Sequence, residues 1–393
     1  MPSPPLVAPP VDLLAFPATP ARARDNANDV EEELRGKTRT RLGPGILANA
    51  SDTDTRSLVV GARGDLVAPP PRQSPRGYPH LVKRILLARP RGYCAGVERA
   101  IQTVETLLER TGPPVYVRRQ IVHNTHVVSD LERRGAVFVD DESDVPEGAT
   151  VVFSAHGVAP EVRMGAARRG LEVVDATCPL VTKVHREAVR FAGRDVTILL
   201  IGHAGHDEVV GTTGHAPANT ILVQTTDHAE TVRVPDPARV AYLTQTTLSV
   251  DETAGIVAVL RRRFPRIQGP PSEDICYATQ NRQQAVKEIA RRSDLVLVIG
   301  SANSSNSTRL VEVARSCGAS ARLIEDETAI EPCWLDGVQT VGLTAGASAP
   351  EHLVACVVST LRSLGADEVE EVRVAEEHVT FGLPVAARAA AVL

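Results

Sequence analysis

The hydrophobic pattern of the chain consists of short, continuous apolar runs separated by longer amphipathic stretches. Seven runs are rich in Val, Ile and Leu, at residues 84–88, 114–118, 150–155, 196–202, 239–244, 295–300 and 340–346. Continuous runs of this kind are typical of parallel strands that are covered on both faces. Between the runs, apolar residues recur at helical spacing, as at Val97, Ile101, Val104 and Leu108. The alternation predicts an α/β protein with parallel sheets.

Three segments repeat one pattern, in which a strand leads to a turn with a cysteine and then to a helix. They read RILLARPRGYCAGVERAI, LEVVDATCPLVTKVHREAV and SEDICYATQNRQQAVKEIA, with Cys94, Cys178 and Cys276 in the turns. The repeat predicts three pseudo-symmetric α/β units, each placing a cysteine at the C-terminal edge of a strand, where open parallel sheets bind ligands. The predicted units span 83–177, 178–272 and 273–362, and 363–393 is predicted to be a C-terminal tail.

Residues 1–80 have a different composition. They hold 13 of the 28 prolines of the chain and no cysteine. Such a segment cannot bury enough apolar surface to offset its chain entropy, so we expect a disordered, Pro-rich extension. A transit peptide is the alternative, but the acidic run at 31–33 argues against it.

Composition narrows the classes of function. The net charge of −5 and the 3% of aromatic residues argue against nucleic-acid binding. No apolar stretch approaches the roughly 18 residues of a membrane span. The six cysteines include no CxxC pair, which is unlike a secreted disulfide framework, so a cytoplasmic protein is expected. Three of them lie outside the repeated turns and are predicted to be buried fillers: Cys317, Cys333 and Cys356.

A second set of loops follows the predicted strands and is rich in His, Ser, Thr, Asn and Gly, without Lys or Arg. These loops lie at 122–126, 154–157, 202–211, 244–249, 301–307 and 344–350. Each loop taken alone has another explanation. Residues 301–307 could be a cluster that caps a helix N-terminus, and His203 and His206 could be a pair of metal ligands. Because all six fall at strand ends, we favour one shared enclosure for the phosphate of a small ligand, closed off from water.

The three cysteine turns allow several chemistries. Zinc would find three thiolates and an open position, without the usual local pairing. A thiol nucleophile would need only one cysteine and a base, for which His123, His156 or His206 could serve. An iron–sulfur cluster, normally held by four thiolates, would keep one iron without a protein ligand. A non-enzymatic redox sensor that binds a phosphorylated metabolite is a further alternative.

From about residue 84 to 382 the chain resembles the 4-hydroxy-3-methylbut-2-enyl diphosphate reductase (LytB/IspH) family. The resemblance is carried by the motifs PRGYCAGVERAI, VHNTHVV, FSAHGV, DATCPLVTKVH, IGHAGHDEVVGTTG, TQTTLSVDET, DICYATQNRQ, GSANSSNSTRL and TAGASAPE. It implies three α/β units around a central [4Fe–4S] cluster with one open iron.

The resemblance also implies roles for individual residues. The cluster ligands would be Cys94, Cys178 and Cys276. The diphosphate would be held by His123, His156, His206, Ser304, Ser305, Asn306 and Ser348. Glu208 would be the acid and Thr246 would lie near the substrate hydroxyl. One departure is Asp207, which stands where the family commonly has Pro, and His126 is given no role.

The implied activity is the last step of the non-mevalonate isoprenoid pathway. The substrate would be (E)-4-hydroxy-3-methylbut-2-enyl diphosphate, and the products isopentenyl and dimethylallyl diphosphate. Glu208 would pass a proton through Thr246 and the bound diphosphate so that the hydroxyl, bound at the open iron, leaves as water. The two electrons would come from a donor such as ferredoxin or flavodoxin.

Overall fold

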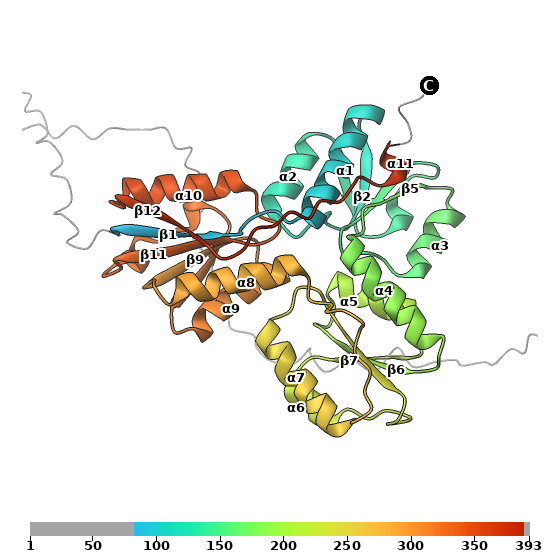
Figure 1. Cartoon of the computed structure of the whole chain (residues 1–393). Coiled ribbons are helices and arrows are strands. Elements are labelled where there is room, and N and C mark those ends of the chain that lie inside the picture. The colour runs from blue at the N-terminus through green and yellow to red at the C-terminus, as the bar shows by residue number, and fades with distance from the viewer. Residues whose placement is uncertain (1–81, 389–393) are drawn as a thin grey trace, which may run out of the picture. The chain divides into compact units, whose positions relative to one another are not determined.

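The computed structural model describes residues 82–388, and the extension predicted at 1–80 lies outside the described residues. Within them the chain forms three parallel sheets that belong to one compact unit (Figure 1). The predicted α/β class with parallel sheets is therefore confirmed.

The largest sheet, sheet A, has five strands in the order β10-β9-β11-β1-β12. Their bounds are β1 Arg84–Arg89, β9 Leu295–Ile299, β10 Ser320–Ile324, β11 Thr340–Ala345 and β12 Glu368–Arg373. Side chains of alternate residues fill a core on each face: Ile85 and Leu297 pack towards α10 (Glu351–Ser363), whereas Leu86 and Val296 pack towards α8 (Tyr277–Ala290) and α9 (Ser305–Ser316). Both faces are covered, which explains the continuous apolar runs.

Sheet B has the order β3-β2-β4-β5, and sheet C has the order β7-β6-β8. The strands of sheet B are β2 Val115–Arg118, β3 Ala136–Val139, β4 Thr150–Phe153 and β5 Glu172–Asp175. Those of sheet C are β6 Thr197–Ile201, β7 Thr220–Val223 and β8 Val240–Thr244. Sheet B is covered by α1 Ala95–Thr111, α2 Thr125–Arg133 and α3 Pro160–Arg168. Sheet C is covered by α4 Pro179–Ala192, α5 Asp207–His215, α6 Thr226–Thr231 and α7 Val250–Arg263.

The three sheets are joined in a cycle by three helices. The chain leaves β1 of sheet A and enters α1, which packs on sheet B. It leaves β5 of sheet B and enters α4, which packs on sheet C. After sheet C it enters α8, which packs on sheet A. The cysteine turns therefore lie at the three crossovers between sheets.

The seven predicted strand runs all contain strands, and six of these seven strands lie in sheet interiors. Of the five other strands, β5 was predicted within the second cysteine repeat and β3, β7, β10 and β12 were not predicted; all five form edges of their sheets. Edge strands are paired on one side only and carry exposed, partly charged residues; β12 reads EVEEVR. The sequences of β10 and β12 therefore lack a continuous apolar run, whereas β3 (AVFV) and β7 (TILV) are apolar but only four residues long.

Strand pairing differs from the predicted division of the chain in two places. β1, from the stretch 83–177, lies between β11 and β12 of sheet A instead of pairing in sheet B. β12, from the predicted tail at 363–393, is a strand of that same sheet and leads to the short helix α11 (Val385–Arg388). β1 is hydrogen-bonded on both sides, and both partner strands come from the far end of the chain.

One expectation about the repeated turns was wrong. The residues before Cys276 form no strand; the chain reaches this cysteine from α7 through an irregular segment, in which Gln268 makes a single bridge to Ala241.

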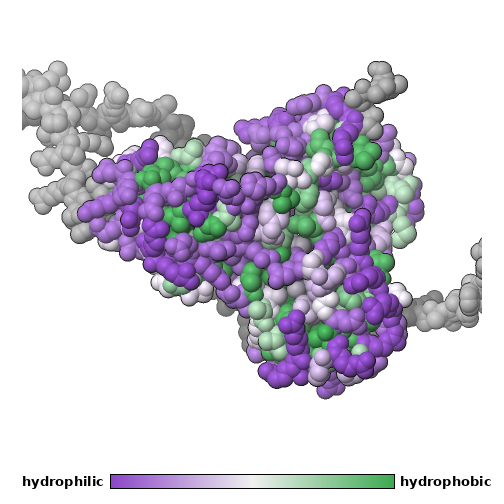
Figure 2. All heavy atoms as spheres, in the orientation of Figure 1, coloured by the Kyte–Doolittle hydropathy of each residue, from purple (hydrophilic) through white to green (hydrophobic). Residues whose placement is uncertain are grey.

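The face seen in Figure 2 is mostly hydrophilic over the helices, with hydrophobic side chains showing in small groups. No helix in 82–388 is long and apolar enough to cross a membrane.

Candidate active site

The three crossover cysteines occupy equivalent positions. Each is the N-cap residue of its helix, Cys94 of α1, Cys178 of α4 and Cys276 of α8. Each backbone N–H donates to a carbonyl oxygen in the loop after a strand of a sheet at that crossover. The three bonds are Cys94 to Ala347 (3.2 Å), Cys178 to Ala155 (3.0 Å) and Cys276 to Thr246 (3.0 Å). One local geometry is thus repeated three times around a common centre.

The cysteines line one cavity of about 90 Å³. A Cβ atom on Gly96 would lie 2.7 Å from the Sγ of Cys178 and 3.9 Å from that of Cys94. Any side chain at this position would therefore push the thiols apart. None of the described residues that line the cavity is Lys or Arg, so the thiols have no cationic neighbour there.

The thiols have the chemistry of a site for a metal group. Burial, and then the neighbouring cysteines, raise the pKa of Cys178 to about 12. Burial likewise raises the pKa of Cys276 to about 11. Thiolates are the form that binds metal, and a bound cation would stabilise three of them here. Three soft donors around one cavity fit an iron–sulfur group.

The other cysteines do not match their predicted role as buried fillers. Cys333 and Cys356 are exposed and Cys317 is half-buried. Cys356 lies on the outer side of α10, where the apolar neighbours Leu353, Val354 and Val357 provide the buried face. The apolar residues near Cys356 in the sequence therefore form the opposite, buried face of the helix, and Cys356 itself points outwards.

The three predicted histidines meet in one cluster. The rings of His123 and His156 are stacked with centroids 4.0 Å apart, and His206 stands edge-on to them at 5.4 and 5.8 Å. Burial, followed by His123 and His206, lowers the pKa of His156. Burial, followed by His123 and then His203, lowers the pKa of His206 to about 4. At neutral pH both rings are therefore uncharged hydrogen-bonding groups until an anion binds beside them.

Asp207 lies beside this cluster. Its Oδ2 is 3.5 Å from Nε2 of His123, and its other oxygen pairs with Arg119 of the β2 end. Burial would raise the pKa of Asp207, but its interactions with His123, His156 and Arg119 outweigh burial and lower it. Arg119 has a positive φ of 55°, which is uncommon for a residue with a side chain. Asp207 thus links the loop after β2 to the start of α5.

The polar residues at the start of α9 lie between sheets. Ser304 is the N-cap, Ser305 Oγ accepts a hydrogen bond of 3.1 Å from Thr247, and Asn306 Oδ1 accepts one of 2.9 Å from the N–H of Ala347. Across the site, Ser348 Oγ donates to the carbonyl of His123 at 2.8 Å. The N-terminus of α9 and the hydroxyls around it are a suitable place for an anion.

Glu208 is 2% exposed, and both oxygens of its carboxylate accept hydrogen bonds from one residue, Thr246. Its Oε1 accepts the N–H of Thr246 at 2.6 Å, and its Oε2 accepts the hydroxyl of Thr246 at 3.0 Å. Burial raises the pKa of Glu208 to about 7, against the lowering effect of these two bonds. Both residues line the thiol cavity. The carboxyl group is thus poised to hold or release a proton near neutral pH.

Sequence reasoning missed several residues of the site. Thr279 and Thr247 line the cavity, and the Thr279 hydroxyl accepts hydrogen bonds from the Cys276 thiol at 3.2 Å and Asn306 Nδ2 at 3.3 Å. A threonine three residues after an N-cap cysteine was a signal available in the repeated turn. The suggested metal pair of His203 and His206 is absent from the described site, because Nε2 of His203 lies 2.9 Å from Arg309 instead.

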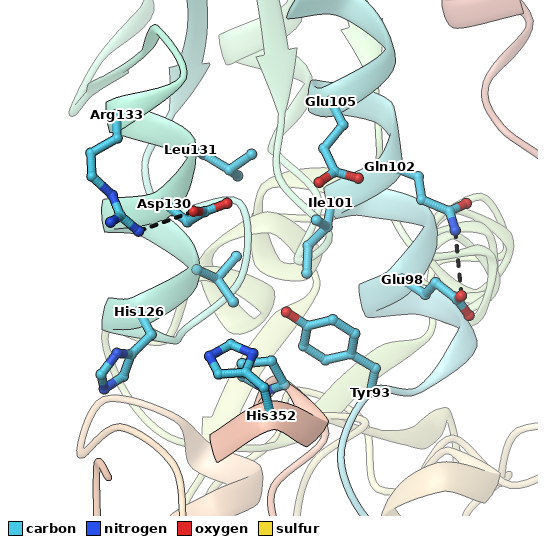
Figure 3. Close-up of a pocket in the computed structure, with 12 residues that line it drawn as sticks. Tyr93, Glu98, Ile101, Gln102, Glu105, His126, Asp130, Leu131, Arg133 and His352 are labelled. Carbon is cyan, nitrogen blue, oxygen red and sulfur yellow. Dashed lines mark hydrogen bonds and ion pairs between the residues drawn. The ribbon is translucent and has the colours of Figure 1, made fainter. Parts of the chain in front are cut away.

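A separate pocket of about 420 Å³ lies between α1 and α2, on the outer side of the Cys94 turn. Figure 3 shows Tyr93 and His352 facing it, with acidic groups at Glu98, Glu105 and Asp130. His126 also lines this pocket and lies 3.1 Å from Asp326, away from the histidine cluster.

Comparison with known proteins gives the family. The family model "LytB protein" matches residues 85–362. A 4-hydroxy-3-methylbut-2-enyl diphosphate reductase of Leifsonia xyli is 63% identical over 303 residues, which cover 77% of this chain and 90% of the relative. The reductase of Acidothermus cellulolyticus is 62% identical, with 77% and 89% covered.

Solved structures agree with the sequence matches. The E-1-hydroxy-2-methyl-but-2-enyl-4-diphosphate reductase of Plasmodium falciparum is 39% identical and superposes with a TM-score of 0.76, covering 78% of this chain and 98% of that one. The family implies an iron–sulfur cluster, in agreement with the three thiols around one cavity. The chain therefore belongs to the LytB protein family, together with these diphosphate reductases.

Proposed function

We propose that the chain reduces (E)-4-hydroxy-3-methylbut-2-enyl diphosphate to isopentenyl and dimethylallyl diphosphate. The reaction consumes two electrons and two protons and releases the hydroxyl oxygen as water. The single observation that carries this proposal is one cavity that joins three thiols to a buried acid, Glu208. The relatives that share most of this chain's length are named for the same activity.

The cofactor in this proposal is one [4Fe–4S] cluster per chain, held by Cys94, Cys178 and Cys276. When bound, it supplies the two electrons one at a time and one Lewis-acidic iron without a protein ligand. The chain's contribution is to hold the three thiols at equivalent helix N-termini, where the partial positive charge of each helix favours a thiolate. Half-buried Phe381 and Val97 help to exclude water from the same cavity.

The histidine cluster binds the diphosphate in this proposal. His123, His156 and His206 surround it with ring nitrogens, and binding of the anion would favour protonation of His156 and His206, whose pKa values are low in its absence. The hydroxyl and amide groups at Ser304, Ser305, Asn306 and Ser348 hold its remaining oxygens, with the N-terminus of α9 aimed at the negative charge.

Glu208 and Thr246 deliver the proton for the leaving group. Hydroxide is a poor leaving group, so protonation of the departing oxygen is worth several orders of magnitude in rate. The Glu208 carboxyl, whose pKa is about 7, passes its proton to the Thr246 hydroxyl at 3.0 Å, which donates in turn to the substrate oxygen. The two residues need no large movement for this relay, since both already line the cavity.

We also propose that the electrons come from a small donor protein such as ferredoxin or flavodoxin, and that the protein works in the cytoplasm. One-electron donation suits an iron–sulfur acceptor, and unpaired thiols persist in a reducing compartment.

The test compares Cys178→Ser with Cys356→Ser, which changes an exposed cysteine of α10 outside the cavity. Iron, zinc, the absorption spectrum and anaerobic turnover with a chemical reductant are measured on the same samples. We expect Cys178→Ser to lose most of its iron and activity and Cys356→Ser to retain both. Full activity in Cys178→Ser, or zinc in place of iron in the unmutated protein, would refute the proposal.

A further inference from the structure

Arg282 of α8 is buried completely, and its guanidinium group is bound on every side. It donates to the carbonyl oxygen of Gly92 at 2.8 and 3.1 Å and to that of Tyr93 at 3.1 Å. These two residues directly precede Cys94. One side chain on the helix that starts at Cys276 therefore holds the turn that carries another cysteine of the cavity.

The charge of Arg282 is balanced by one carboxylate from the C-terminal segment. Glu377 accepts two hydrogen bonds from Arg282, at 2.9 and 3.2 Å, and one of 3.1 Å from Asn281. Its side chain is 15% exposed, in contrast to that of its neighbour Glu376, which is 57% exposed. A buried cation with one partner makes that partner hard to remove, because the charge would be left unpaired.

Glu377 belongs to residues 374–388, which we call the C-terminal strap. The strap continues from β12 of sheet A and ends in α11, beside α1 and β5 of sheet B (Figure 1). Its N-terminal end is bound through the Val374 N–H to the Arg89 carbonyl at 3.0 Å. Further along, the Gly382 carbonyl accepts from Arg99 at 2.9 Å, and the Ala387 carbonyl accepts from Arg110.

Between these anchors the strap places Phe381 against the thiol cavity, which this ring lines together with the three cysteines. The residues on either side, Thr380 and Gly382, are exposed. At this point a single segment of the chain therefore lies between the cavity and solvent.

We infer that Arg282 and Glu377 are positioning residues that fix the Cys94 turn and hold the C-terminal strap closed over the thiol cavity. This inference rests on the proposed iron–sulfur site. Closure shields the group held by the thiols from water and oxidants, and opening of the strap at Phe381 gives them access. The buried ion pair sets how often this opening occurs, because the other polar anchors described above are hydrogen bonds to neutral backbone carbonyls of Arg89, Gly382 and Ala387.

The test compares two adjacent isosteric changes, Glu377→Gln and Glu376→Gln. Glu376 pairs with two residues close to it in the sequence, Arg373 at 2.7 Å and His378 at 3.5 Å, so its change removes the same charge without removing a partner of Arg282. Iron-loaded full-length proteins are prepared anaerobically, and iron release to an excess of chelator is followed by absorbance. We expect roughly a tenfold or greater acceleration in Glu377→Gln and no change in Glu376→Gln.

Phe381→Ala provides a second variant, which removes the covering ring and leaves the ion pair intact. It should also accelerate iron release, while its urea midpoint in the iron-free form stays close to that of the unmutated protein. Equal release rates in Glu377→Gln, Phe381→Ala and Glu376→Gln would overturn the inference. Absence of iron from the unmutated protein at the start would refute the proposed cofactor instead, so the two failures are distinguishable.

Discussion

Replacement of Glu208 by Gln changes the site by one ionisable group and little else. Glu208 accepts the N–H of Thr246 with one oxygen and the Thr246 hydroxyl with the other. A glutamine in the same place can accept the N–H with its oxygen and donate to the hydroxyl with its amide, so both bonds persist. The variant therefore tests the effect of the ionisable proton of Glu208 while the packing of the side chain stays the same.

The magnitude follows from the pKa. Burial raises the pKa of Glu208 from 4.5 to about 7, so the folded chain keeps this proton at pH values where the unfolded chain has lost it. The favourable contribution of the protonated group is complete below pH 4.5 and is lost as the pH rises through 7. The total loss is about 3 kcal/mol. At pH 8 the iron-free Gln variant should therefore be about 3 kcal/mol more stable than the unmutated protein, and near pH 4 the two should be equal.

Urea unfolding of the iron-free proteins between pH 4 and 8 measures this difference. Glu161→Gln is the control, since Glu161 is an exposed carboxylate of α3 outside the cavity. In the iron-loaded enzyme, Glu208→Gln should leave the absorption spectrum in place and lower turnover by about 10²- to 10⁴-fold. Parallel stability curves for the Gln variant and the unmutated protein would refute the buried, protonated carboxyl, and normal turnover would place the acid elsewhere.

Two further predictions concern the diphosphate site. Gly157→Ala should destabilise the fold and raise the KM of the diphosphate substrate, because a Cβ there would lie 2.5 Å from Cε1 of His185 at a φ of +77°. Gly148→Ala is the control, because Gly148 has a similar φ of +74° but no atom lies within 4 Å of the added Cβ. The difference in unfolding free energy between the two variants therefore reports the clash with His185 alone. Equal losses of unfolding free energy in both variants would contradict this clash. Asp207→Asn should raise the inhibition constant of inorganic diphosphate with kcat nearly unchanged, since it weakens the contact that orients His123; a fall in kcat alone would show another role.

The sequence was sufficient to predict the strands of the sheet interiors but not which sheet each would join. The run at β1 predicts a strand covered on both faces, and it is one. Nothing local in it says that its partners are β11 and β12, more than 250 residues away in the chain. β12 itself, EVEEVR, resembles an exposed helix face or a tail as much as an edge strand. Pairing of this kind is decided by the whole core, which periodicity does not describe.

The predicted site residues stand in recognisable local motifs, whereas the residues that were missed act through contacts between segments far apart in the chain. The cysteine turns, histidine loops and Ser-Asn loop each have a recognisable local pattern. Arg282 and Glu377 do not, since a buried arginine in a helix and an acid in a terminal segment look like ordinary surface residues in a sequence. Their role depends on a contact across 95 residues.

The position of the cysteines at the crossovers explains why one site requires three sheets. Each of α1, α4 and α8 starts at a cysteine and packs on the sheet that follows, so the helix N-terminus points back to the place where two sheets meet. Three such N-termini around one cavity supply partial positive charge to three thiolates without any lysine or arginine. A single unit would present one thiol with no partner, and two units would leave the cavity open on one side. The free energy of binding a group to all three thiols would therefore be available only to the complete arrangement of three sheets, and it would add to the stability of that arrangement.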